Sequence, residues 1–128
     1  MMSNNKAHIL LIEDNPNNIK LMEMLLEEQG YQVTVDTNAE AGIINAKELS
    51  PDLILLDIQL PEMDGMEACR IMRQEPSLEY TPIIALTAFA MPGDRERILE
   101  NGFDEYMSKP IKYREFLDLV NKILTHED

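Results

Sequence analysis

Short apolar runs alternate along the chain with longer segments in which apolar residues recur at helical spacing. The clearest runs are His8–Ile12, Leu53–Leu56 and Pro82–Leu86, and weaker ones lie at Gln32–Val35 and Glu105–Ser108. Short, continuous apolar runs are typical of strands that are buried on both faces of a parallel sheet. The segments between them predict helices at about Pro16–Gln29, Ala39–Leu49, Met66–Gln74, Pro92–Glu100 and Tyr113–Leu124.

Glycines and prolines agree with this division. Gly30, Gly65 and Gly102 lie where helices begin or end, and Pro16 and Pro92 suit the first turn of a helix. The pattern is therefore five strands alternating with five helices, (βα)5. Such alternation predicts an α/β fold with one doubly wound parallel five-stranded sheet, covered on both faces and joined by right-handed crossovers.

Length and composition favour one soluble domain. The chain has 128 residues, of which 45% are hydrophobic, and shows no internal repeat or linker. We expect one domain over residues 1–128, with residues 1–6 and 126–128 as frayed tails. No apolar run approaches the ~20 residues of a membrane span, and the N-terminus lacks the apolar stretch of a signal peptide.

Charge and cysteine content narrow the class further. There are 24 acidic residues and 11 basic ones, for a net charge of −13, which disfavours direct binding to nucleic acid or anionic membranes. The single cysteine, Cys69, has no partner for an internal disulfide, which fits a cytoplasmic location. We expect it to pack as a small hydrophobic residue.

Polar residues follow four of the predicted strands. Glu13 and Asp14 follow the first, Asp57 the third, Thr87 the fourth and Lys109 the fifth. Because ligands of doubly wound sheets bind at the carboxyl ends of the strands, we expect these side chains to converge. Three clustered carboxylates repel one another unless a cation lies among them, and an all-oxygen site favours Mg²⁺ over zinc. The alternative is a set of solvated acids that cap strand ends and helix starts.

The stretches ILLIEDN, DLILLDIQLPEMDG, IIALTA and YMSKP closely resemble the receiver domains of bacterial two-component signalling. The resemblance runs from His8 to the last helix, and the segment ALTAFAMPGDRERILENGFDEYMSKPI is most similar to DivK-type single-domain receivers. It implies the flavodoxin-like strand order 2-1-3-4-5. It also implies a phosphoryl-accepting signalling switch in a phosphorelay, rather than an enzyme that turns over a substrate.

The resemblance assigns chemical roles to five residues. Asp57 would accept a phosphoryl group from a phosphohistidine on a histidine kinase or a histidine phosphotransfer protein. Asp14 would bind Mg²⁺ directly and Glu13 through water, with Asp57 and the backbone carbonyl of Gln59 as further ligands. Lys109 would contact the phosphoryl oxygens.

It also implies a conformational response. Thr87 would move toward the acyl phosphate together with the adjoining backbone at Ala88, and Tyr106 would follow as the switch aromatic. The family usually has a cis peptide bond at the position of Lys109–Pro110.

Two residues are expected to set the lifetime of the phosphoryl group. Gln59 and Phe89 lie two positions beyond Asp57 and Thr87, where they would overhang the acyl phosphate. Phe89 is large and apolar, so we expect it to obstruct the water that attacks in line.

The helix predicted at Pro16–Gln29 is a candidate docking surface for the phosphoryl donor. Its apolar residues spread over an arc of about 220°, wider than a core-facing stripe requires. Leu21 and Leu25 lie near the middle and should be buried. The residues expected to contact the partner lie nearest the phosphorylation edge: Asn15, Asn18, Ile19 and Met22. Scattered exposed hydrophobic residues, common on soluble proteins, are the alternative.

Rival functions fit less well. A haloacid-dehalogenase-like phosphatase would need a second acid where this chain has Gln59. A nucleotide-binding fold would need a glycine-rich loop after the first strand, where Glu13 and Asp14 would repel phosphate. We expect a stand-alone receiver that acts on a downstream protein target, the alternative being a receiver module excised from a larger hybrid kinase or multidomain regulator.

Overall fold

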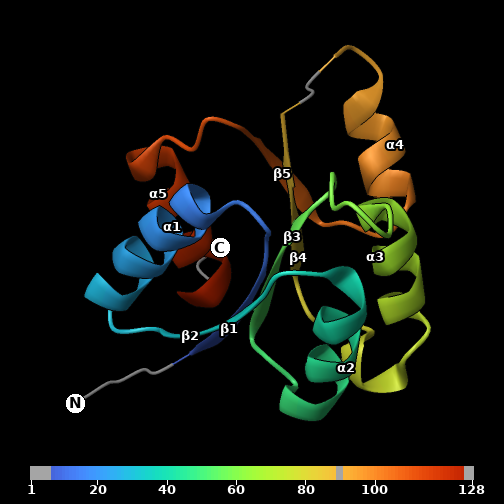
Figure 1. Ribbon diagram of the computed structural model, residues 1–128, viewed down its shortest axis with the longest axis horizontal. Coiled ribbons are helices and arrows are strands. Elements are labelled where there is room, and N and C mark those ends of the chain that lie inside the picture. The colour runs from blue at the N-terminus through green and yellow to red at the C-terminus, as the bar shows by residue number, and fades with distance from the viewer. Residues whose placement is uncertain (1–6, 89–90, 126–128) are drawn as a thin grey trace.

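The computed structural model describes residues 7–88 and 91–125, which form one parallel sheet and the helices that cover it (Figure 1). The strands are β1 (His8–Ile12), β2 (Gln32–Asp36), β3 (Leu53–Asp57), β4 (Ile83–Thr87) and β5 (Glu105–Ser108). The helices are α1 (Pro16–Glu28), α2 (Ala39–Leu49), α3 (Gly65–Arg73), the short 3₁₀ helix η1 (Pro76–Leu78), α4 (Asp94–Glu100) and α5 (Tyr113–Thr125). None of these helices is long and apolar enough to cross a membrane.

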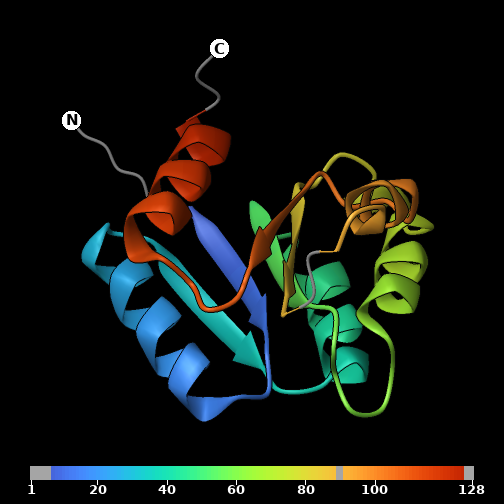
Figure 2. The same ribbon diagram turned by 90° about the horizontal axis from the view of Figure 1, so that it is seen from above.

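The sheet has the order β2-β1-β3-β4-β5 with all neighbours parallel, as predicted. Helices α1 and α5 cover one face, and α2, α3 and α4 lie on the other (Figure 2). Alternate residues of one strand enter different cores: Ile9 and Leu11 pack toward α1 and α5, whereas Leu10 and Ile12 pack toward α2 and α3. Because both faces are covered, every residue of β3 and β4 is buried, which explains their continuous apolar runs.

Helix α1 begins where its sequence predicts. The Asn15 side chain accepts hydrogen bonds from the backbone N–H groups of Asn17 (2.9 Å) and Asn18 (3.1 Å), and Pro16 occupies the first turn. An asparagine cap satisfies donors that have no partner inside the helix, and proline lacks the N–H that would be unpaired there. The cap fixes the start of α1 directly after the polar end of β1.

The start of α4 was predicted wrongly. The helix begins at Asp94, two residues after Pro92, because Gly93 adopts a left-handed conformation with φ of +93°. A residue with positive φ does not continue a right-handed helix, so Pro92 lies outside it. The Asp94 side chain instead accepts a hydrogen bond from Met91 N at 2.8 Å.

The buried stripe of α1 also differs from the prediction. Met22 and Leu26 are fully buried, whereas Leu21 and Leu25 are only half-buried. Met22 and Leu26 are four residues apart and therefore lie on one face of the helix, the face that enters the core. Met24 is the most exposed large apolar residue of this helix, at 50%.

Cys69 behaves as expected, as a small buried residue of α3. Burial raises the pKa of its thiol to about 12. The reactive form of cysteine is the thiolate, so this position is inert at neutral pH.

Candidate functional site

The polar residues that follow the strands meet at one edge of the sheet. Glu13, Asp14 and Asp57 each place a carboxylate oxygen within 4.8 Å of the others, and they are the one such group in residues 7–88 and 91–125. Lys109 enters the group from the end of β5. Thr87, the last residue of β4, is buried beside it, and its backbone oxygen accepts a hydrogen bond from Lys109 N at 2.7 Å. The predicted convergence is confirmed.

The carboxylates differ in their access to water. Glu13 and Asp57 are buried, at 0% and 3% exposure, whereas Asp14 is exposed. Burial raises the pKa of Glu13, and the negative charge of Asp57 raises it further. The charged form of Glu13 is therefore costly in this structure, because it is removed from water beside a like charge.

Lys109 partly offsets this cost. Its ammonium Nζ donates to Asp57 Oδ2 at 2.9 Å and to Glu13 Oε2 at 3.3 Å, and lies 3.1 Å from Glu13 Oε1. Burial alone would lower the pKa of Lys109, but the hydrogen bonds to Asp57 and Glu13 outweigh it, so the pKa is raised. Lys109 therefore stays charged. The peptide bond to Pro110 is cis, as the resemblance implied.

Backbone N–H groups orient both buried carboxylates. Gln59 N donates to Asp57 Oδ1 at 2.8 Å, while Asn15 N donates to Glu13 Oε2 at 3.1 Å. Asp57 thus has the ammonium on one oxygen and an amide on the other. A carboxylate held on both sides is fixed in orientation before any reaction begins.

Gly65 allows the loop after β3 to fold back closely on the site. A Cβ atom at this position would lie 2.6 Å from the Asp57 carbonyl oxygen and 2.6 Å from Ile58 Cα. Gly65 N also donates to the Ile58 carbonyl at 2.8 Å. The sequence marked Gly65 only as a helix boundary, so this close approach was missed.

The group suits a hard divalent cation. Three carboxylates against one ammonium leave an excess of negative charge. Glu13 Oε1 is buried and makes no hydrogen bond, and its ionic partner is the shared ammonium of Lys109 at 3.1 Å. The donors are all oxygens, the ligands that Mg²⁺ prefers, and no histidine or cysteine belongs to the group. The residues present therefore fit Mg²⁺. The expected contribution of the Gln59 carbonyl stays a prediction.

Of the expected switch residues, Thr87 and Ala88 lie at the same edge, whereas Tyr106 lies inside the sheet opposite Ala85. Ala88 N donates to the side-chain Oε1 of Gln59 at 3.1 Å, and Tyr106 is half-buried against the core that contacts α2 and α3. Thr87 also lines a pocket of about 270 Å³. Phe89 lies outside the described residues, so its expected role stays a prediction.

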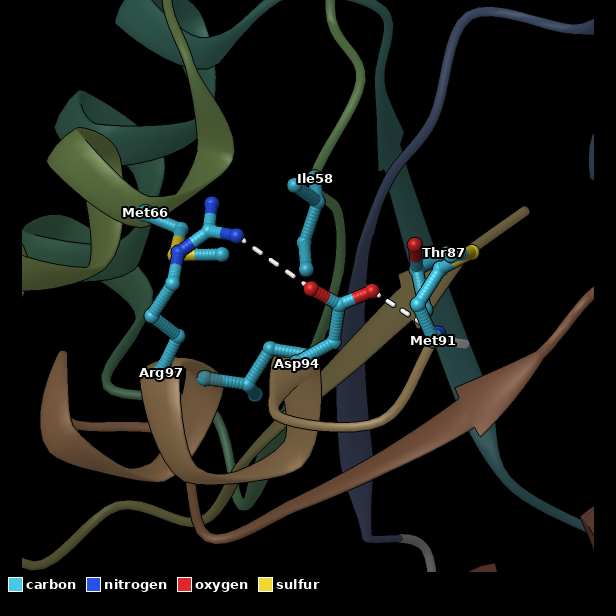
Figure 3. Close-up of a pocket in the computed structure, with 7 residues that line it drawn as sticks. Ile58, Met66, Thr87, Met91, Asp94 and Arg97 are labelled. Atoms are coloured by element: carbon cyan, nitrogen blue, oxygen red, sulfur yellow. Dashed lines mark hydrogen bonds and ion pairs between the residues drawn. The ribbon is translucent and has the colours of Figure 1, made fainter. Parts of the chain in front are cut away.

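Figure 3 shows this pocket between the loop after β3 and the start of α4. Asp94 lies between Met91 and Arg97 and contacts both, accepting from Arg97 Nη1 at 3.2 Å. The other lining residues are Ile58, Met66, Thr87 and Ile98. The pocket is mainly apolar and adjoins the site through Thr87.

The predicted docking residues are not equally accessible. Asn15 is exposed, and Asn18 and Ile19 are partly exposed near the start of α1. Met22 was assigned wrongly, because its side chain is fully buried in the core and has no surface to offer a partner. Ile19 packs partly against the same core, which limits how much of it a partner would touch.

Comparison with known proteins gives a consistent family. The sequence profile described as the response regulator receiver domain matches residues 9–121. The polar-differentiation response regulator DivK of Brucella anthropi is 41% identical over 116 residues, covering 91% of this chain and 94% of that protein. The DivK of Brucella ovis is 40% identical over the same length and coverage.

Solved structures agree on the fold. The receiver domain of sensor histidine kinase PA1611 from Pseudomonas aeruginosa, with a magnesium ion coordinated in its active-site cleft, is 37% identical. It superposes with a TM-score of 0.87 over 94% of this chain and 99% of that one. The signal receiver domain of a histidine kinase from Syntrophus aciditrophicus is 36% identical, with a TM-score of 0.81 over 94% and 91% of the two chains.

Proposed function

The chain belongs to the response regulator receiver domain family, and from this premise we propose that it accepts a phosphoryl group on Asp57 and thereby controls protein partners. The family is a signalling switch rather than a classical enzyme. The observation that carries the proposal is the position of Asp57, which is buried among carboxylates and bonded to Lys109. A carboxylate of this kind is a competent acceptor that forms an aspartyl phosphate.

The proposed transfer is a displacement at phosphorus. An oxygen of the Asp57 carboxylate attacks the phosphorus of a donor phosphohistidine, and the bond from phosphorus to the imidazole nitrogen breaks. The electron pair of that bond stays on the imidazole. Lys109 lies close enough to neutralise charge on the transferred group, and Gln59 N holds the carboxylate in place. Phosphoryl transfer asks the protein mainly for such alignment and charge neutralisation.

We propose that Glu13, Asp14 and Asp57 hold Mg²⁺, with the Gln59 carbonyl as a further ligand. When bound, the ion would supply positive charge to the carboxylates and the phosphoryl oxygens. The excess of three carboxylates over the single ammonium of Lys109 supports this proposal. So does the magnesium ion reported for the PA1611 receiver domain.

We propose that Thr87, the Ala88 backbone and Tyr106 transmit the phosphorylation. Thr87 is buried at the end of β4, and the half-buried Tyr106 is on the neighbouring strand. Gln59 and Phe89 are proposed to set the lifetime of the phosphoryl group. We expect the backbone amide signal of Ala88 in an NMR spectrum to shift when the protein is phosphorylated. An unchanged signal would contradict this proposal.

The proposed partners are a histidine kinase or phosphotransfer protein as donor and a downstream protein as target, in the cytoplasm. Asn15, Asn18 and Ile19 lie at the end of α1 nearest Asp14 and are proposed to contact the donor. If the donor docks there, Ile19→Glu should accept the phosphoryl group more slowly than the wild type from a phosphohistidine donor. Its rate with acetyl phosphate should equal that of the wild type. The kinase-borne receivers at 36% and 37% identity support a second candidate, the same switch acting as a module of a hybrid kinase.

The experiment that tests the function is labelling by acetyl phosphate followed by intact-mass spectrometry. We expect one phosphoryl group per chain in millimolar Mg²⁺ and none after EDTA, because the carboxylates repel the donor when no cation is bound. Restoring Mg²⁺ should restore the label. Labelling that is equally fast in EDTA would contradict the proposed site.

Mg²⁺ is also expected to raise the melting temperature of the unphosphorylated protein. Folding raises the pKa of Glu13 above its ordinary value of 4.5. Ionised Glu13 therefore lowers the free energy of unfolding, and this loss grows as the pH rises above 4.5 and is present at neutral pH. A cation that binds only the folded site relieves this cost, and the gain grows with its concentration. An upward shift that EDTA reverses is the expected result, with Asp14→Asn as the weakened control. Equal melting curves with and without Mg²⁺ would count against the site.

A further inference from the structure

The backbone N–H of Ala88 is released from the sheet at the end of β4. Ile58 N donates to the Leu86 carbonyl at 2.9 Å, as the parallel ladder between β3 and β4 requires. The next rung of that ladder would run from Ala88 N to the Ile58 carbonyl. That carbonyl instead accepts from Gly65 N at 2.8 Å.

The side chain of Gln59 accepts the hydrogen bond from Ala88 N that the ladder would otherwise have accepted. Its side-chain Oε1 accepts from Ala88 N at 3.1 Å, while its own backbone N donates to Asp57 Oδ1 at 2.8 Å. One residue therefore ties the carboxylate of Asp57 to the first residue after β4. We call the contact between Gln59 Oε1 and Ala88 N the Gln59 bridge.

The bridge lies where phosphorylation adds new acceptors. Ala88 is two residues beyond Leu86, the ladder partner of Asp57, so its N–H lies at the same edge as the carboxylate. A phosphoryl group brings charged oxygens to this edge, and a charged acceptor makes a stronger hydrogen bond than a neutral amide oxygen.

We propose that the Gln59 bridge holds the backbone at Ala88 in its unphosphorylated position, and that the phosphoryl group must displace it to switch the protein. The inference rests on the proposed phosphorylation of Asp57. Gln59 is then a positioning residue: it acts through Ala88 and sets how readily the backbone at Ala88 responds. Its contact with Ala88 opposes the switched state, because that contact exists only before the phosphoryl oxygens arrive.

Three variants separate the bridge from other effects of Gln59. Gln59→Met keeps the length of the side chain without an amide oxygen, Gln59→Asn keeps the amide but is one methylene too short, and Gln59→Glu keeps an acceptor at the right length. Gln59 is exposed, so all three are expected to fold.

The first measurement uses the unphosphorylated protein and does not depend on phosphorylation. In Gln59→Met and Gln59→Asn, the Ala88 amide proton is expected to exchange with water about two-fold to ten-fold faster, the range expected for one hydrogen bond. Gln59→Glu should exchange no faster than the wild type, because its carboxylate can still accept from Ala88 N. An exchange rate equal to that of the wild type in both Gln59→Met and Gln59→Asn would show that the bridge does not exist.

The second measurement titrates each protein with beryllofluoride, a mimic of the phosphoryl group, in the presence of Mg²⁺. Gln59→Met and Gln59→Asn should bind it about two-fold to ten-fold more tightly than the wild type, since no bridge has to be broken. Equal or weaker binding by both would refute the competition. A wild-type protein that binds no beryllofluoride would refute the proposed function instead, and the displacement step with it, whereas the amide exchange would still decide whether the bridge exists.

Discussion

Asp57→Asn is expected to carry no phosphoryl group under conditions that label the wild-type protein fully. The substitution keeps the size of the side chain and the oxygen that accepts from Gln59 N, but it removes the negative charge and the nucleophilic carboxylate. Intact-mass spectrometry after incubation with acetyl phosphate and Mg²⁺ measures the result directly. Because the acceptor itself is lost, the expected effect is complete rather than partial.

Two controls show that the loss is chemical. Asp118→Asn makes the same change in charge at an exposed position of α5 and should be labelled like the wild type. In Asp57→Asn itself, Lys109 still has Glu13 as an ionic partner, so the melting curve should stay cooperative. Undiminished labelling of a folded Asp57→Asn would remove Asp57 as the acceptor.

The strands and the site edge were predictable from sequence because each depends on local pattern and topology. A strand buried on both faces must be apolar throughout, so the runs at Leu53–Leu56 and Pro82–Leu86 located β3 and β4 to within one residue. Parallel strands end at one edge, so acids that follow them must meet there. The positions of Glu13, Asp14 and Asp57 therefore followed from the strand assignments.

Details that depend on distant contacts were not predictable. A helical wheel gives the width of the apolar arc of α1 but not its buried centre, and the core selects Met22 and Leu26 rather than Leu21 and Leu25. The Gln59 bridge likewise depends on Gly65 using the carbonyl of Ile58. No property of Gln59 in the sequence indicates that contact.

Arg73 is a second residue whose role appears only in the folded chain. Its guanidinium donates to the carbonyl oxygens of Leu78 (2.8 Å), Thr81 (2.7 Å) and Gly102 (2.9 Å), and to Asp104 Oδ2 at 2.7 Å. These partners lie on two connections: the segment from α3 to β4, which contains η1, and the turn between α4 and β5. The Glu79 carbonyl, on the first of these connections, also accepts from Arg73 at 3.3 Å. The planar guanidinium, with five N–H donors, is the side chain suited to so many acceptors at once.

The same contacts fix the entry to β4. The Asp104 oxygen that binds Arg73 also accepts a hydrogen bond from Ile83 N at 2.9 Å, so Arg73, Asp104 and the first residue of β4 form one network. The Arg73 side chain is only 19% exposed, which limits how far water replaces it. Hydrogen bonds to charged groups contribute about 1.5–3 kcal/mol each, but members of one network are not additive.

Arg73→Ala is therefore expected to lower the free energy of unfolding by about 2–4 kcal/mol, a large effect for one substitution on a helix surface. The loss arises because four carbonyl oxygens and one carboxylate lose a shared donor. Arg73→Lys should recover only part of it, since an ammonium cannot reach acceptors arranged around a plane. Arg70→Ala is the matched control, because Arg70 lies on the same helix as Arg73 and makes an exposed hydrogen bond to Asn101. This variant should lower the free energy of unfolding by less than about 1 kcal/mol. Urea unfolding of the three variants measures the difference, and equal midpoints for Arg73→Ala and Arg70→Ala would show that the network adds no stability.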